Sequence, residues 1–221
     1  MEHVESLNTV QASALTTNKL IRNTYTLLGL TLAFSALMAG VSMMSNWPPL
    51  PMWLLLVGVI GFPVLIEKNI NSAVGIALVF AYTGFLGASL GPILSMFLAT
   101  EQGSMVVMQA LGGTAAIFFG LSAYAFSTRK DFSFMGGFLC VGALVAFLAG
   151  IAAYFFNMPT LSLAVSAAFI LISSGFILFQ TSRIVNGGET NYVRAAVTLY
   201  ISIFNLFVSL LRLLSAFSGR N

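Results

Sequence analysis

The polar side chains that could do chemistry in this chain lie on two stripes within long apolar segments. One stripe has spacings of 4, 3, 4 and 3 residues and comprises Thr198, Ser202, Asn205, Ser209 and Arg212. At about 100° per residue, these positions share one side of a helix. The other has spacings of 4, 7 and 7 residues and comprises Ser162, Ser166, Ser173 and Gln180. Such stripes form hydrogen bonds between membrane helices or line a polar path, and the sequence leaves both interpretations open.

The remaining reactive residue types are few and scattered. The single histidine, His3, precludes a Ser-His-Asp set in the apolar region, and the single cysteine, Cys140, precludes a thiolate metal cluster. No HExxH or P-loop pattern is present. We therefore predict a protein that is not an enzyme, with no cofactor and no metal cluster. We interpret Glu189, in the polar loop that precedes the last apolar segment, as a solvated loop acid.

The composition indicates a membrane protein. Of the 221 residues 58% are apolar and only 7% are charged, whereas about 25% are charged in a typical soluble domain. Five blocks contain no charged residue; they hold 44, 32, 27, 51 and 17 residues. Because about 20 apolar residues span a bilayer, these blocks predict an all-α polytopic membrane protein whose first partner is the lipid bilayer. The basic residues occur in ones and twos, which argues against nucleic-acid binding.

The two longest blocks each contain a break that divides them into two spans. Three prolines lie within residues 48–51 and one lies at Pro159, and proline ends helices. The count becomes seven helices. We predict Tyr25–Met44, Met52–Ile66, Ala73–Ala99, Met105–Ser127, Phe134–Phe156, Leu161–Ser182 and Ala195–Phe217.

The distribution of basic residues predicts the orientation. Seven Lys and Arg residues fall in one set of alternate loops and two in the other, which places the N-terminus in the cytoplasm and the C-terminus outside. Residues 1–22 form a cytoplasmic tail in this scheme, residues 23–218 the seven-helix domain and residues 219–221 the C-terminal end. We expect Met1–Asn18 to be disordered, because they lack an apolar face, and we expect no cleaved signal peptide.

Several segments together resemble a known family. They are LIRNTYTLLGLTLAFSA, AYTGFLGASLGPIL, LGGTAAIFF, SAYAFSTRKDFSFMGG, AVSAAFILISSGFILF and FQTSRIVNGGETNYVRAAVTLYISIFNLFVSLL. They are similar to the Bax-inhibitor family, also called TMBIM or YccA-like, and most of all to its bacterial YccA-like branch. The resemblance covers residues 19–212 and implies a seven-helix bundle with a central last helix, in the bacterial inner membrane.

The functions that this resemblance implies differ between branches. Some members are pH-sensitive calcium leaks with an aspartate pair, and Gln180 and Ser202 stand at the matching positions here, while Arg212 matches a basic position. Neither Gln180 nor Ser202 carries the carboxylate that calcium prefers. The YccA-like branch is implied to bind and restrain a membrane-anchored FtsH-type AAA protease. We rank protease modulation first and a leak for calcium or another cation second, and we predict that Gln180 and Ser202 lie in contact range.

Overall fold

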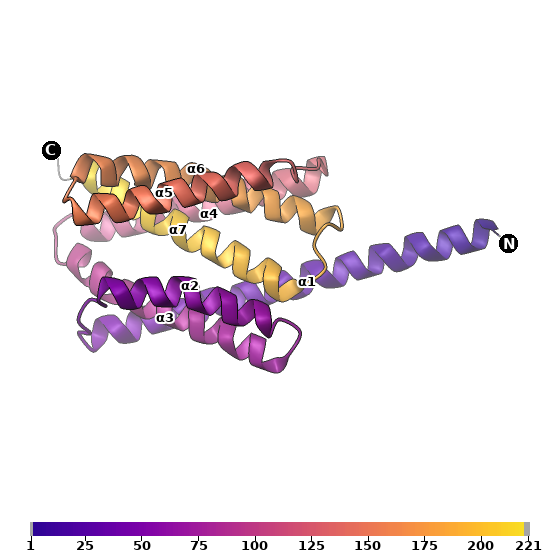
Figure 1. Cartoon of the computed structure of the whole chain (residues 1–221), viewed down its shortest axis with the longest axis horizontal. Coiled ribbons are helices and arrows are strands. Elements are labelled where there is room, and N and C mark those ends of the chain that lie inside the picture. Colours follow the sequence, from indigo (N-terminus) through magenta and orange to yellow (C-terminus); the bar gives the residue numbers. More distant parts are fainter. Residues whose placement is uncertain (1, 219–221) are drawn as a thin grey trace.

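The computed structural model describes residues 2–218, with the backbone alone for residues 2–16. All regular secondary structure in this part of the chain is helical (Figure 1). The helices are α1 (Glu2–Met44), α2 (Met52–Lys68), α3 (Ala73–Leu98), α4 (Gly103–Thr128), α5 (Met135–Phe155), α6 (Pro159–Val185) and α7 (Tyr192–Ser218). From α2 onward, the predicted segments agree with these bounds to within about three residues.

Helix ends occur where the sequence places residues that stop or start a helix. Ser72 caps α3, because its side chain accepts a hydrogen bond from the N–H of Gly75 at 3.3 Å. Pro159 occupies the first position of α6, where its missing N–H costs nothing. Asn46 and Asn157 follow α1 and α5 with φ of 49°, a left-handed conformation that asparagine tolerates. Capping side chains, proline and left-handed asparagines thus explain where these helices begin and end.

The first helix differs from the prediction. We predicted a disordered tail up to Asn18 and a helix from Tyr25, whereas α1 begins at Glu2 and is continuous to Met44. No proline or glycine occurs between Glu2 and Leu28, so nothing in the sequence breaks the helix. Figure 1 shows this N-terminal part of α1 projecting from the bundle as an extended arm.

The seven helices run alternately up and down the bundle. The loops that follow α2, α4 and α6 gather at the end from which the N-terminal arm projects, and the other three loops lie at the opposite end with the C-terminus (Figure 1). Six helices are long and apolar enough to cross a membrane, the first of them over Thr17–Met44. The remaining helix, α2, has 17 residues. Large exposed apolar side chains such as Leu37, Val57 and Phe138 cover the outside, as is typical of a lipid-facing surface.

Two glycines of α3 allow that helix to approach α1 closely. A Cβ atom added at Gly87 would lie 2.2 Å from the carbonyl oxygen of Ser35, and one at Gly91 would lie 2.5 Å from the hydroxyl of Ser42. Ser42 in turn donates a hydrogen bond to the carbonyl of Ala88 at 2.8 Å. The GxxxG pattern of Gly87 and Gly91 therefore serves packing within one chain.

The core surrounds the last helix. α7 packs against α1, α3, α4 and α6 and contributes the largest share of the main buried cluster, including Leu199, Tyr200 and Leu206. This is the central position that the family resemblance implies. Because α6 packs against this central helix, side chains of both polar stripes can lie inside the bundle.

Candidate functional site

A buried carboxylate occupies the loop between α6 and α7. Glu189 is only 2% exposed, although it lies between the exposed residues Gly188 and Thr190. An ionised carboxylate needs hydrogen bonds and opposite charge to be stable out of water. The groups around Glu189 supply both.

Three donors form hydrogen bonds with this carboxylate. Its Oε1 atom accepts from the backbone N–H groups of Thr190 and Asn191, both at 3.0 Å. Its Oε2 atom accepts from the side-chain amide of Gln180 at 3.4 Å. Gln180, itself 2% exposed, thus orients Glu189 from the last turns of α6.

Two arginines neutralise the charge of Glu189. Arg183 Nη2 lies 3.7 Å from Oε2 and Arg194 Nη1 lies 3.6 Å from Oε1. Arg183 is itself held in place, because it donates a hydrogen bond to the carbonyl of Gly188 at 2.7 Å and lies 5.6 Å from the centre of the Phe179 ring. With two cations and three donors, the buried acid is fully compensated.

The local sequence explains how the loop brings these groups together. Gly187 has φ of +76°, which a glycine adopts without strain, and this turn reverses the chain after α6. Asn191 then caps α7, since its Oδ1 atom accepts from the N–H groups of Val193 at 2.9 Å and Arg194 at 3.2 Å. The turn and the cap fix Glu189 between them.

Two contacts connect the residues around Glu189 to the α2–α3 region. The side-chain amide of Asn191 donates to Asn71 Oδ1 at 2.9 Å. Arg194 forms an ion pair with Glu67 at the end of α2, and the Nε–Oε2 distance is 3.2 Å. This guanidinium holds the pKa of Glu67 below its usual range, chiefly through the hydrogen bond between them.

A further contact ties α6 to the α4–α5 loop. Ser182 donates a hydrogen bond to the carbonyl of Lys130 at 2.8 Å and accepts one from the N–H of Phe132 at 3.1 Å. All three loops at the arm-bearing end are therefore fastened to α6 or α7. We call Glu189, Gln180, Arg183, Asn191 and Arg194 the Glu189 cluster.

The solvated position predicted for Glu189 is wrong. The prediction assumed that an acid in a short polar loop faces water, but Arg183 and Arg194 lie on helices that converge at this loop. The sequence carried a signal, because an arginine stands six residues before Glu189 and another five residues after it. Their convergence depends on the packing of α6 against α7.

The predicted stripes face the interior, but their hydroxyl groups form hydrogen bonds locally. Ser166, Ser173, Ser202 and Ser209 are all buried. Ser166 donates to the carbonyl of Ser162 at 3.0 Å, and Ser202 donates to the carbonyl of Thr198 at 2.8 Å. The hydroxyls of Ser166 and Ser202 are thus satisfied on their own helices.

Three residues of the α7 stripe are more exposed than its two serines. Thr198 and Asn205 are half-buried, and Arg212 is exposed. Arg212 lies at the end of the bundle opposite the Glu189 cluster.

Comparison with known proteins identifies the family. A family model described as "Inhibitor of apoptosis-promoting Bax1" matches residues 17–219. The chain belongs to the Bax-inhibitor family. It is 50% identical over 221 residues, covering all of both chains, to the Escherichia coli K12 protein named "Modulator of FtsH protease YccA". An uncharacterized protein of Pseudomonas aeruginosa is 46% identical over 218 residues, which cover 99% of this chain and 98% of that protein.

The resemblance inferred from the residues is thereby confirmed. The role that the resemblance implies for Gln180 and Ser202, as the positions matching an aspartate pair, stays a prediction. Gln180 and Ser202 are both buried on the packed helices α6 and α7. The hydrogen bonds of the described residues join Gln180 to Glu189 and Ser202 to Thr198 rather than to each other. A loop acid, Glu189, thus contacts Gln180.

A second buried polar cluster in this Bax-inhibitor chain was not predicted. The hydroxyl of Tyr200 lies 2.7 Å from that of Ser35 and donates to the carbonyl of Thr83 at 3.2 Å. It joins α7 to α1 and α3. The signal was the tyrosine itself, since a phenol in the middle of an apolar helix requires a hydrogen-bond partner when buried.

The arrangement around Glu189 is suited to fastening helices. Its oxygens are engaged by protein donors and cations. Among residues 17–218, no group of three His, Cys, Asp or Glu side chains is placed to hold a metal ion. The chemistry of the cluster is charge pairing and hydrogen bonding between α2, α6 and α7.

Proposed function

We propose that this protein is a modulator of a membrane-anchored FtsH-type AAA protease in the bacterial inner membrane. The observation that carries the proposal is the 50% identity, along the full length of both chains, to a protein named as a modulator of FtsH protease. A second relative of the same identity is named as an inner membrane protein. The aligned region covers the N-terminal arm, the loops and every helix.

The N-terminal arm supplies a contact element for such a partner. The helical arm projects beyond the bundle (Figure 1), at the same end as the Glu189 cluster. A projecting segment is accessible to a second protein without any rearrangement of the seven helices. We infer that the protease contacts this arm from the cytoplasmic side.

We further propose that all seven helices span the membrane, with the N-terminus in the cytoplasm. The alternating direction of the helices supports this count, because α2 lies alongside the longer helices (Figure 1). The arm-bearing end carries seven basic residues, namely Lys19, Arg22, Lys68, Arg129, Lys130, Arg183 and Arg194. A basic end of this kind stays in the cytoplasm.

The topology has a direct test. An alkaline phosphatase domain fused after residue 221 becomes active only outside the cytoplasm, so we expect activity there and none after residue 70, between α2 and α3. A reversed pair of results would contradict the orientation. A C-terminal fusion active only in the cytoplasm would contradict the seven-span count.

The site gives a calcium leak less support. Calcium binds six to eight oxygen atoms, largely from carboxylates, and the Glu189 carboxylate already contacts Gln180, two arginines and two backbone N–H groups. A leak would need that arrangement to open. Calcium flux into liposomes between pH 6 and 8 measures this alternative directly.

Co-purification tests the main proposal. The full chain should retain the FtsH-type protease of its own membrane after detergent extraction, and a chain lacking residues 2–18 should lose it. A chain in which residues 2–18 are scrambled keeps the length and composition of the arm and serves as the matched control. Equal retention by all three chains would show that the arm is not the contact, and no retention by the full chain would contradict the proposed function.

A further inference from the structure

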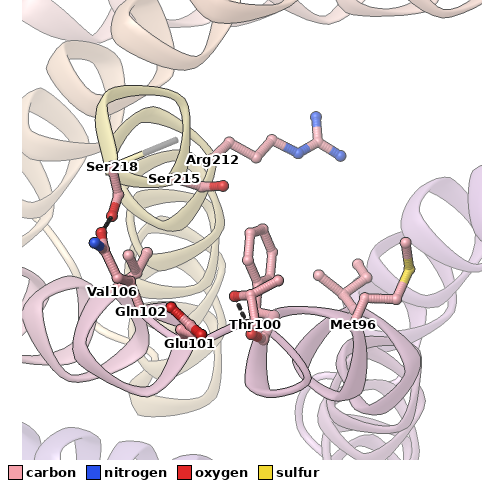
Figure 2. Close-up of a pocket in the computed structure, with 11 residues that line it drawn as sticks. Met96, Thr100, Glu101, Gln102, Val106, Arg212, Ser215 and Ser218 are labelled. Carbon is pink, nitrogen blue, oxygen red and sulfur yellow. Dashed lines mark hydrogen bonds between the residues drawn. The ribbon is translucent and has the colours of Figure 1, made fainter. Parts of the chain in front are cut away.

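An open pocket lies at the end of the bundle opposite the Glu189 cluster. Its volume is about 670 Å³, and α3, the α3–α4 loop, α4 and the last turns of α7 form its walls. Figure 2 shows Arg212 extending from α7 over this space, with Glu101 on the loop at the other side. The pocket thus has one basic and one acidic wall.

These two charged residues are not paired with each other or with other described residues. The ion pairs found among residues 17–218 all involve Arg183 or Arg194, at the other end of the bundle. The hydrogen bonds drawn in Figure 2 join Ser218 to Gln102 and Thr100 to the carbonyl of Phe97. Within residues 17–218, neither the guanidinium of Arg212 nor the carboxylate of Glu101 is engaged in an ion pair.

The apolar part of the pocket is continuous with the lipid-facing surface. Ile93, Met96 and Phe97 line it from α3, and Met96 is 71% exposed. The helices that meet here are candidate membrane spans, so the pocket lies where a span ends and the polar head groups begin. An arginine stem lying along apolar surface, with its charge toward the head groups, is favourable at this level.

We propose that this pocket binds the head group of a phospholipid that carries both a phosphate and a primary ammonium group. The phosphate accepts hydrogen bonds from Arg212, whose planar guanidinium matches phosphate oxygens. The ammonium group donates to Glu101, and the acyl chains follow Met96 and Phe97 into the bilayer. A purely anionic head group satisfies Arg212 but meets repulsion from Glu101, so charge complementarity selects the zwitterion.

The test uses the full chain in nanodiscs that contain equal amounts of phosphatidylethanolamine and phosphatidylglycerol. Lipid that stays bound after transfer to detergent is identified by native mass spectrometry. We expect retained phosphatidylethanolamine to exceed phosphatidylglycerol about threefold, the effect of one partly exposed charge pair. Equal retention of the two lipids by the wild-type chain would overturn the proposal.

Four variants locate the effect. Arg212→Gln should lose most of the bound lipid of both kinds, and Arg212→Lys should keep part of it. Glu101→Gln should remove the preference by raising the retention of phosphatidylglycerol. Arg129→Gln, an exposed arginine at the other end, is the matched control and should behave as wild type. Unchanged retention in Arg212→Gln, or an equal loss in Arg129→Gln, would overturn the assignment.

Two soluble probes separate a lipid site from a small-molecule site. Inorganic phosphate and free phosphoethanolamine each carry part of the head group but no acyl chain. Neither should displace the bound lipid at millimolar concentration if the apolar wall contributes. Displacement by either probe would show that the pocket takes a soluble ligand, which contradicts the lipid proposal.

Discussion

The two ends of this bundle use their charged residues in opposite ways. At the arm-bearing end, Glu189 is buried and paired with Arg183 and Arg194. At the other end, Glu101 and Arg212 line one pocket without an ion pair between them. The charges of the first end are compensated within the chain, whereas those of the second are accessible.

One end of the bundle therefore uses its charges to hold helices together, and the other presents charged residues at a pocket. The Glu189 cluster joins α6 and α7 to the end of α2 through Arg194 and Glu67, so its removal should be felt in stability. At the pocket lined by Arg212 and Glu101, no ion pair between described residues connects two helices. Substitutions there should therefore affect binding and have little effect on stability. Substitutions at matched residues of the two ends measure this contrast.

The largest effect is expected for Glu189→Gln. The substitution keeps the size of the side chain but removes the charge that two arginines and two backbone N–H groups surround. We expect a loss of about 2–3 kcal/mol in stability, since hydrogen bonds to charged groups and buried charge partners are costly to remove. Thermal unfolding in detergent measures it, with Glu101→Gln at the other end as control. Equal melting temperatures for the two variants would contradict the claim that charged residues stabilise only the arm-bearing end.

A smaller effect is expected for Asn191→Ala. This residue caps α7 and also contacts Asn71, and loss of a helix cap costs about 1 kcal/mol. Asn71→Ala removes the contact and keeps the cap, so it should cost less. The difference between the two melting temperatures gives the contribution of the cap. A larger loss for Asn71→Ala would show that the contact between Asn71 and Asn191 matters more than the cap.

A weak pH dependence is expected from Glu67. Its pKa is lowered in the folded chain by Arg194, so the pair adds stability above the unfolded glutamate pKa of about 4.3. That stability is lost as the pH falls through the lower folded pKa. The pair is solvent-exposed, so we expect less than about 1 kcal/mol. The melting temperatures of wild type and Glu67→Gln should differ at pH 6 and converge toward pH 3, and a constant difference would exclude this origin.

The smallest effect on stability is expected for Arg212→Gln. Its side chain is exposed and forms no ion pair with a described residue, and such substitutions usually stay within about 0.5 kcal/mol. Unfolding in detergent without added lipid isolates this term. A loss comparable to that of Glu189→Gln would show that both ends hold the bundle together.

Several features of the fold could be predicted from single segments. Long charge-free blocks require helices that satisfy their own backbone groups in lipid, so the helical segments from Met52 onward follow from hydropathy and proline positions. The start of α1 could not be placed in this way, because residues before Lys19 have neither an apolar run nor a helix breaker. Hydropathy identifies segments that are buried in lipid, so it does not predict where a helix that projects beyond the bundle begins.

The candidate site was predicted only in part. The stripe positions Gln180 and Ser202 are both buried, and their spacing already placed each on one polar face of its helix. Their predicted contact with each other stays a prediction. The partner of Gln180 was not predicted. It comes from the loop, nine residues later in the chain, and periodicity along a helix carries no information about where a loop side chain turns.

The class of protein, the helical segments from Met52 onward and the family follow from the sequence alone, because charge-free length, helix breakers and motif residues are properties of local stretches. Only the packing of the helices buries Glu189, brings Arg183 and Arg194 to it, and sets Arg212 and Glu101 on one pocket. The energy of a charge depends on which opposite charges and donors lie within a few ångströms of it. Those distances are set by how helices far apart in the chain pack together.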